Sequence, residues 1–303
     1  MAGIANIIYG ADFSNSPLGK VTLKQSTEET ASTIVNAYTT AIGDDTYSTQ
    51  LTKMVSDLIS LGEWNDLDIY PILGNTVNRL CVNLNPNNGY TKAPIVILED
   101  GLPQVGADNK SIQLTRHTTY GNSAETTLPS TLVTRDEIYE TDTDISGMYA
   151  FVDFYRTSDS TMAFFYHKRA TGHIGTILRV PATNTNDGAP QFKLGANSVT
   201  STPENTIACT TDFPFLKNER RRLEVIADGA TLDLYVNEVK ATPNGATNTY
   251  HYDTTKTFTR NNSFCHCAGG NALFYVQGNI DPTHFDAVNT IFKTFLDAVK
   301  PNE

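Results

Sequence analysis

Residues 26–62 carry two successive runs of apolar residues with the spacing of an amphipathic helix. Ser26 and Glu29 have the spacing of a capping box at the start of the first run, and Gly43 follows its end. The second run stops at Gly62. These runs predict a helical hairpin in which each helix buries one face. The positions expected to be buried are Ala31, Ile34, Val35, Tyr38 and Ile42 in the first helix, and Leu51, Met54, Val55, Leu58 and Ile59 in the second.

After residue 75 the apolar period changes to two, and runs of Val, Ile, Thr, Tyr and Phe alternate with turn residues. In the segment 221–242, alternating apolar residues on either side of Asp228-Gly229 predict a β-hairpin. Residues 147–170 likewise predict a strand, a polar turn and a second strand. Such short strands favour a two-sheet antiparallel sandwich or jelly roll over a parallel α/β sheet.

The end of the chain returns to a helical period. Asp281 can cap this helix and Pro282 can occupy its first turn, and Pro301 follows its end. The helix is expected to pack on the sheet or on a neighbouring subunit. Its predicted buried face consists of Phe285, Val288, Phe292, Phe295, Leu296 and Val299. The expected organisation is an extended segment (1–25), a helical hairpin and junction (26–75), and a β-sandwich with a C-terminal helix (76–303).

Composition narrows the classes of function. The chain has 303 residues, 39% of them apolar, which is enough for a globular core. A net charge of −11 with only 22 Lys and Arg argues against nucleic-acid binding, which depends on basic side chains. The first residues lack the basic region of a secretory signal, and the longest apolar run, Pro94–Leu98, is too short for membrane insertion. We expect a soluble protein made in a cytosol.

The four cysteines do not form a disulfide framework or a metal motif. Cys81 and Cys209 are isolated, and Cys265 and Cys267 flank His266. In a strand the two thiols would point one way and the imidazole the other, so a zinc site is not expected there.

The junction between the helical hairpin and the β region is unusually rich in bulky and turn-forming residues. Trp64 and Tyr70 each combine a large apolar face with one polar group. Pro71 biases Tyr70 away from helix, and Gly74 permits a turn. We interpret these four residues as an assembly junction that fastens the helices to the edge of a sheet. A core tryptophan under an ordinary loop and a ligand-binding tryptophan are the alternatives.

Three segments resemble a known family. The stretch "DGATLDLYVNEV" is similar to a strand–turn–strand of concanavalin A-like (laminin G-like) jelly rolls, with Glu238 where the family has glycine. The junction "EWNDLDIYPILGNTVNRLCVNLNP" is similar to one in structural proteins of tailed bacteriophages. The closing "ALFYVQGNIDPTHFDAVNTIFKTFLDAV" resembles the last strand and helix of those lectin-fold virion proteins. The three segments also occur in the family's order.

This resemblance implies a non-enzymatic virion protein, such as a fibre, decoration or tail-associated protein, assembled in the cytoplasm of a bacterial host. It implies a homo-oligomer, with a trimer as the first expectation, in contact with other virion proteins and with host surface polysaccharide. The short helices fit this role, because their apolar faces must be buried on the sandwich, on other copies or on a shell protein.

A glycoside hydrolase of jelly-roll fold and a bacterial carbohydrate-binding module are the alternatives. The hydrolase requires two carboxylates flanking the scissile bond, and the pattern Glu-x-Asp-x-x-Glu is absent. Glu140, Asp142 and Asp144 would share one strand face if extended. Three interpretations of this cluster are open: a solvated turn, a calcium site that includes Asp142 and Asp144, or a catalytic site. No catalytic residue and no cofactor other than this calcium are expected.

The best candidates for carbohydrate binding lie where aromatic planes accompany hydrogen-bonding groups. On the strand "MYAFVDFYR", Tyr149, Phe151, Asp153 and Tyr155 share one face, and Tyr166 on the next strand could join them. Alternatively, these aromatics are buried against the helices or a second subunit. The basic run Glu219–Arg222 is expected to form a rim of subunit contacts or plain surface.

Overall fold

The computed structural model describes the backbone of residues 27–73, 79, 82–85, 96–97, 104–105, 112–114, 132–133, 147–156, 162–166, 176–180, 191–194, 205–208, 219–228, 231–241, 264–267 and 270–299. Side chains are described for residues 27–73, 79, 82–85, 147–155, 219–227, 233–241 and 273–299. Within these ranges the chain forms mostly antiparallel β-sheet with helices at both ends.

The N-terminal helical hairpin has the predicted form. Helix α2 spans Thr27–Ile42 and α3 spans Ser48–Leu61. Ile34 and Ile59 are partly buried, and the other predicted apolar positions are buried. Gly62 ends α3 with φ 90°, a left-handed conformation that glycine adopts without steric cost, and its N–H donates to the carbonyls of Leu58 and Ile59. The capping serine Ser26 lies outside the described residues.

The C-terminal helix also begins as predicted. A 3₁₀ turn, η4 (Pro282–His284), leads into α4 (Phe285–Ala298). The carboxylate of Asp281 accepts a hydrogen bond of 2.9 Å from the backbone N–H of Thr283, which caps the turn. All six predicted apolar positions, Phe285, Val288, Phe292, Phe295, Leu296 and Val299, are buried.

The described strands form three antiparallel sheets. The largest has eight strands, in the order β13-β12-β11-β6-β15-β4-β3, with β1 also paired to β15. A five-stranded sheet has the order β10-β9-β8-β7-β14, and β2 pairs with β5. The bounds are β1 Leu67–Tyr70, β2 Val96–Ile97, β3 Gln104–Val105, β4 Ile112–Leu114, β5 Leu132–Val133, β6 Met148–Arg156, β7 Met162–Tyr166, β8 Thr176–Val180, β9 Gln191–Leu194, β10 Asn205–Ala208, β11 Arg220–Asp228, β12 Thr231–Val236, β13 Val239–Lys240, β14 Phe264–Cys267 and β15 Gly270–Asn279.

The two strands expected within residues 147–170 are present, but they lie in different sheets. Strand β6 lies between β11 and β15 in the large sheet, whereas β7 pairs with β8 and β14 in the five-stranded sheet. Alternation of apolar residues specifies a strand but not its partner, and β6 gains longer partners from distant parts of the chain. The predicted hairpin of β11 and β12 is confirmed, with Asp228 opposite Thr231.

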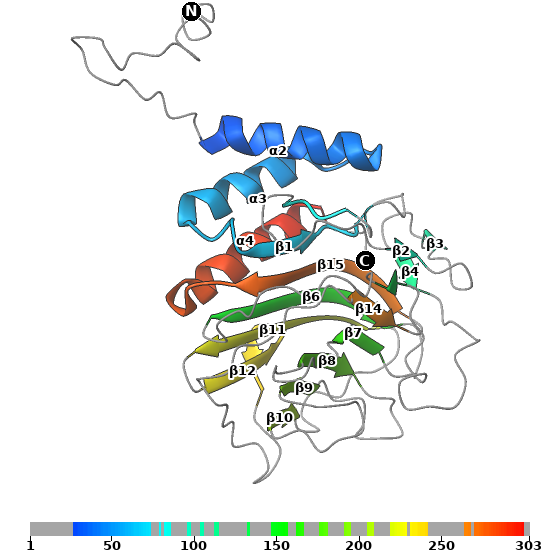
Figure 1. The fold of residues 1–303 in the computed structure, drawn as a ribbon, viewed down its shortest axis with the longest axis vertical. Helices are drawn as coiled ribbons and strands as arrows, with labels where there is room; N and C mark the ends of the chain where they lie inside the picture. Colours follow the sequence, from blue (N-terminus) through cyan, green and yellow to red (C-terminus); the bar gives the residue numbers. More distant parts are fainter. Residues whose placement is uncertain are drawn as a thin grey trace, which may run out of the picture.

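The three helices lie next to one another in the order α2, α3 and α4, and α4 lies beside the large sheet (Figure 1). Helix α4 packs on β6 and β15, α3 packs on α4, and α2 packs on α3. Phe292 is at the centre, with its ring 5.4 Å from that of Phe151 and 5.3 Å from that of Phe274. One continuous apolar core therefore joins the N-terminal hairpin, the C-terminal helix and the sheet.

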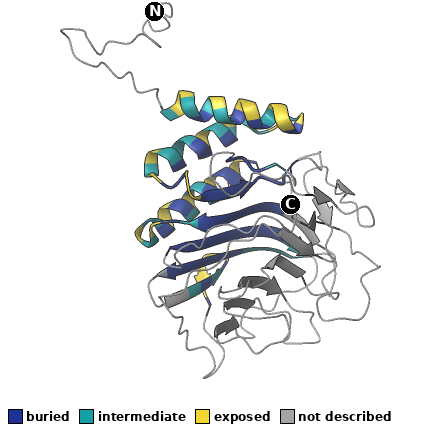
Figure 2. Ribbon diagram, viewed as in Figure 1, coloured by how far each residue is buried: buried dark blue, intermediate teal, exposed yellow. Residues whose placement is uncertain are grey.

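The outermost helix, α2, has a solvent-exposed side (Figure 2). Its exposed residues are mainly small or polar. Glu29, Thr33, Asn36 and Thr40 are exposed on α2. Val239 is the one large apolar side chain that is exposed among the residues whose side chains are described. The apolar stripes of the hairpin are thus buried within the chain, and burying them requires no second subunit.

Candidate functional site

Two of the residues considered for carbohydrate binding are buried under α4. Tyr149 and Phe151 have 1% and 0% of their surface exposed. The Tyr149 ring lies 6.1 Å from Phe285 and 6.3 Å from Phe292, and its hydroxyl donates to Asn289 Oδ1 at 2.5 Å. Packing against the helices, the alternative raised by the sequence, is what the structure shows, so these two rings are not available to stack on a sugar.

The other members of that group are also separated. Asp153 is 1% exposed and forms two hydrogen bonds to Arg220, of 2.8 and 2.9 Å. Tyr155 is partly exposed on β6. Tyr166 is on β7 in the five-stranded sheet, and its side chain is outside the described part. The five residues therefore do not form one binding face on adjacent strands.

The basic run is also used internally rather than as plain surface. Arg220 and Arg222 both approach Asp153, at 2.8 and 3.9 Å, from the neighbouring strand β11. The Arg222 guanidinium also lies 5.6 Å from the centre of the Phe151 ring. These arginines neutralise a carboxylate that the sheet buries.

The junction residues lie inside the chain at the edge of the sheet. Trp64, Tyr70 and Pro71 are buried, and Gly74 is outside the described residues. Strand β1 pairs with β15, and the Tyr70 ring lies 6.0 Å from that of Tyr275. Asn85 donates 2.7 Å to the Trp64 carbonyl and 3.1 Å to the Leu67 carbonyl, which ties the chain after the junction back to its start.

A second contact locks the junction to the start of α4. Glu63, which follows the C-cap residue Gly62 of α3, has a carboxylate oxygen 2.6 Å from His284 Nδ1. The same carboxylate accepts from the backbone N–H of Asp281, at 3.3 Å. The segment that follows α3 and the segment that precedes α4 are therefore connected by direct polar contacts.

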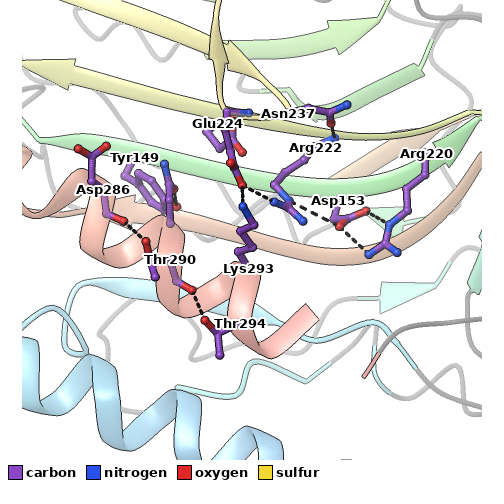
Figure 3. A network of polar contacts seen from close by, with 12 residues as sticks. Tyr149, Asp153, Arg220, Arg222, Glu224, Asn237, Asp286, Thr290, Lys293 and Thr294 are labelled. Carbon is purple, nitrogen blue, oxygen red and sulfur yellow. Dashed lines mark hydrogen bonds and ion pairs between the residues drawn. The ribbon is translucent and has the colours of Figure 1, made fainter. Parts of the chain in front are cut away.

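A polar network joins the sheet to the outer side of α4 (Figure 3). Asn237 and Glu238 form the two-residue turn between β12 and β13, both with positive φ, 49° and 70°. Glu238 Oε1 lies 3.1 Å from Arg222 Nη1 and 2.5 Å from Lys293 Nζ. A glutamate in this conformation is strained by roughly 1 kcal/mol or more, and its two ion pairs offset part of that cost.

Glu224 is the most unusual ionisable group of this network. Its side chain is fully buried, Oε1 has no hydrogen-bond partner, and Oε2 accepts only a 3.4 Å contact from the Glu238 N–H. Burial raises the pKa of the Glu224 carboxyl from 4.5 to about 7, because desolvation outweighs the attraction of Arg222. This burial could not be predicted from the sequence, because Glu224 alternates with Leu223 and Val225 as a solvent-facing residue would.

We predict that Glu224→Gln stabilises the protein at pH 8. The folded-state pKa lies above the unfolded one, so the contribution of Glu224 to stability is complete below pH 4.5 and is lost as the pH rises to about 7. From the pKa shift of Glu224, the free energy of unfolding of the variant should exceed that of the unmodified protein by on the order of 3 kcal/mol at pH 8. At pH 4.5 the gain should be small. Urea unfolding at both pH values measures it.

Glu219→Gln is the matched control, because Glu219 forms a partly exposed pair with Arg221 at 2.6 Å. Its effect on the free energy of unfolding should be small, as for other partly exposed ion pairs. A Glu224→Gln variant that is less stable than the unmodified protein at pH 8 would show that the ionised carboxylate is needed by Arg222.

A half-open pocket of about 230 Å³ lies beside this network, between the β12–β13 turn and α4. The Tyr235 and Phe285 rings, 5.0 Å apart, form its apolar side. Lys293 extends from α4 toward the turn, as Figure 3 shows. The lining residues are Tyr235, Glu238, Phe285, Asp286, Asn289, Thr290 and Lys293.

Metal binding and membrane insertion can also be checked in the described regions. Among residues whose positions are described, no group of three His, Cys, Asp or Glu side chains is arranged to hold a metal ion. Glu140 and the calcium candidates Asp142 and Asp144 lie outside these regions. No helix in the described part of the chain has the length and apolar character needed to cross a membrane.

Comparison with known proteins gives no family assignment. No protein-family model matches the sequence, and no curated protein matches it. Among solved structures, a Caenorhabditis elegans galectin is similar at 12% identity over 48% of this chain and 93% of its own, with a TM-score of 0.29. The CBM40 module of a Ruminococcus gnavus sialidase matches at 13% identity over 48% and 83%, with a TM-score of 0.32. The Bacillus subtilis carbohydrate-binding module CBM66 matches at 12% identity over 59% and 88%, with a TM-score of 0.27. Similarity at this level does not indicate what the chain binds.

Proposed function

We propose that this chain is a non-enzymatic structural protein of a tailed-bacteriophage virion, and that it displays a lectin-type β-sandwich which binds host surface glycans. One observation carries the proposal: the segment that resembles concanavalin A-like jelly rolls and the two segments that resemble tailed-phage structural proteins are in direct contact. Strand β1 of the junction pairs with β15 of the closing segment, and Glu63 contacts His284. Tyr235 of the middle segment packs on Phe285 of α4. Contact between these segments is what a shared fold would require.

The sandwich itself is part of the proposal, with the eight-stranded and five-stranded sheets as its two layers. Support comes from the face of the large sheet opposite α4. Val152, Leu223 and Leu234 lie on that face and are at most 1% exposed, although none belongs to the core shared with the helices. A sheet buried on this face requires a second layer, and a sandwich supplies it.

The absence of catalysis is proposed because the buried carboxylates on the α4 side of the sheet are inaccessible. Asp153 and Glu224 are 1% and 0% exposed, and Arg220 donates hydrogen bonds to both carboxylate oxygens of Asp153. A glycoside hydrolase needs both carboxylates beside the substrate. Incubation with a broad panel of polysaccharides should release no reducing sugar. Release that Glu140→Gln or Asp142→Asn abolishes would favour the hydrolase instead.

Self-association, with a trimer as the first expectation, belongs to the same proposal. Cyclic symmetry would place several copies of a weak glycan site on one particle and increase avidity. Contacts with other copies or other virion proteins would use the polar outer face of α2, which includes Glu29, Thr33 and Asn36. Light scattering of the full chain should give a mass above 33.2 kDa. A monomer at micromolar concentration would remove self-association from the proposal.

Mass spectrometry of purified virions tests the location. The peptides of this chain should copurify with particles through a density gradient, at several copies per particle. Their absence from particles, together with their presence in the medium of uninfected bacteria, would favour a bacterial carbohydrate-binding module.

A further inference from the structure

We propose that the pocket between the β12–β13 turn and α4 binds one neutral sugar residue of a glycan. This inference rests on the glycan binding in the proposed function and adds a location and a ligand class. The site is distinct from the face of Tyr149 and Phe151, which α4 covers.

The chemistry of the lining suits a sugar ring. A sugar presents an apolar C–H face and several hydroxyls, each of which both donates and accepts hydrogen bonds. Tyr235 and Phe285 offer apolar ring surface on one side of the pocket. The other side offers a carboxylate on Asp286, a hydroxyl on Thr290 and an ammonium group on Lys293. Binding sites commonly combine aromatic surface with a few placed polar groups in this way.

Two polar groups of the pocket are held in place before any ligand arrives. The buried Tyr149 hydroxyl donates to Asn289 Oδ1, which orients the Asn289 amide and leaves its N–H groups for other acceptors. The Thr290 hydroxyl donates its proton to the Asp286 carbonyl at 2.7 Å, so its oxygen is oriented as an acceptor. Groups that are already fixed lose less conformational entropy when a ligand binds.

The strained turn at Glu238 also belongs to this pocket. Glu238 has φ 70°, and its carboxylate is bound by Arg222 from the sheet and by Lys293 from α4. Strained residues that surrounding contacts hold in place are concentrated at functional sites. Here the strained residue places a carboxylate at the rim of the pocket. The glycine that is usual at this position in the resembled family would place none there.

Size and charge restrict the ligand. A volume of about 230 Å³ is below the range of roughly 300–1,000 Å³ for pockets that hold drug-sized molecules, so it suits one sugar residue rather than an oligosaccharide. An acidic sugar would face the Asp286 carboxylate and would compete with Glu238 for Lys293. A neutral hexose or N-acetylhexosamine avoids both costs.

Saturation-transfer NMR on the full chain tests this assignment with glucose, galactose, mannose, N-acetylglucosamine and glucuronic acid as probes. At least one neutral sugar should bind, and more tightly than glucuronic acid. The variant with Asp286→Ala and Thr290→Val should bind that sugar about tenfold or more weakly, as expected for losing a hydrogen bond to a charged group. The control carries Asp297→Ala and Thr294→Val, exposed residues of the same helix outside this pocket, and should bind as the unmodified chain does.

The outcomes separate this site from the wider function. Unchanged sugar binding in the Asp286/Thr290 variant, or tighter binding of glucuronic acid, would overturn the pocket assignment and leave glycan binding in place. No sugar binding by the unmodified chain would overturn the assignment as well. Cosedimentation of the chain with host cells then decides whether glycan binding as a whole fails, and virion mass spectrometry tests the structural role independently. Thermal unfolding confirms that both double variants remain folded.

Discussion

A chain shortened to begin at residue 76 is expected not to fold into a stable monomer. The deletion removes α2, α3 and β1, and with them 12 of the 26 buried residues of the apolar core. Leu51, Val55 and Leu58 of α3 would be lost from this core, and residues 275–278 of β15 would lose a paired strand. Exposed apolar surface and an unpaired strand edge both promote aggregation. Size-exclusion chromatography and circular dichroism should show aggregates without a cooperative unfolding transition.

The full-length chain with Thr33→Ala and Thr40→Ala is the control, because both threonines are exposed on α2. It should unfold within about 1 kcal/mol of the unmodified protein, as surface substitutions usually do. A shortened chain that stays monomeric and unfolds cooperatively at an unchanged temperature would mean that the helical hairpin adds nothing to the core. The hairpin would then be free to serve assembly alone.

The sequence predicted the helices well because their signals are local. The apolar spacing that ends at Gly62, and the pairing of Asp281 with Pro282, depend on neighbouring residues only. The apolar face of α4 was predicted position by position for the same reason. The hairpin of β11 and β12 was found because its turn is short, so that each strand pairs with the next in sequence.

The sequence did not predict which strands lie beside β6, because that choice depends on residues more than 60 positions away. The same limit applied at the site. Alternation placed Tyr149 and Phe151 on the face opposite Ala150, Val152 and Phe154, but it left open whether this face binds a sugar or packs against the helices. The covered face of β6 is the one on which α4 packs, and Phe292 of α4 contacts Phe151 and Phe274 there. Glu224 was missed for the same reason.

One departure from the family pattern coincides with a residue of the network. Glu238 stands where glycine is usual in the resembled hairpin, and in the structure it adopts the left-handed conformation that glycine favours. A side chain retained where it is strained suggests that its contacts are useful. Those contacts, to Arg222 and Lys293, are the ones that connect the turn to α4.

Phe292→Ala should lower the free energy of unfolding by about 3–5 kcal/mol, the usual cost of removing a large buried ring. Phe292 is fully buried, and its ring packs 5.4 Å from Phe151, 5.3 Å from Phe274 and 6.3 Å from Tyr149. These neighbours come from two different strands and cannot collapse together without moving the sheet, so a cavity should remain. Urea unfolding followed by tryptophan fluorescence measures the loss, since Trp64, the chain's single tryptophan, is buried in the same core.

Phe292→Leu is the matched control for this cavity. Leucine keeps most of the apolar volume, so the expected loss is smaller than for alanine. Lys293→Ala, one position along the helix, removes an ion pair between half-exposed groups and should cost less than about 1 kcal/mol. If α4 packs on the sheet through Phe292, the loss in free energy of unfolding should rise in the order Lys293→Ala, Phe292→Leu, Phe292→Ala. Equal, small losses for all three would contradict this packing and would leave the face of Tyr149 and Phe151 open to ligands after all.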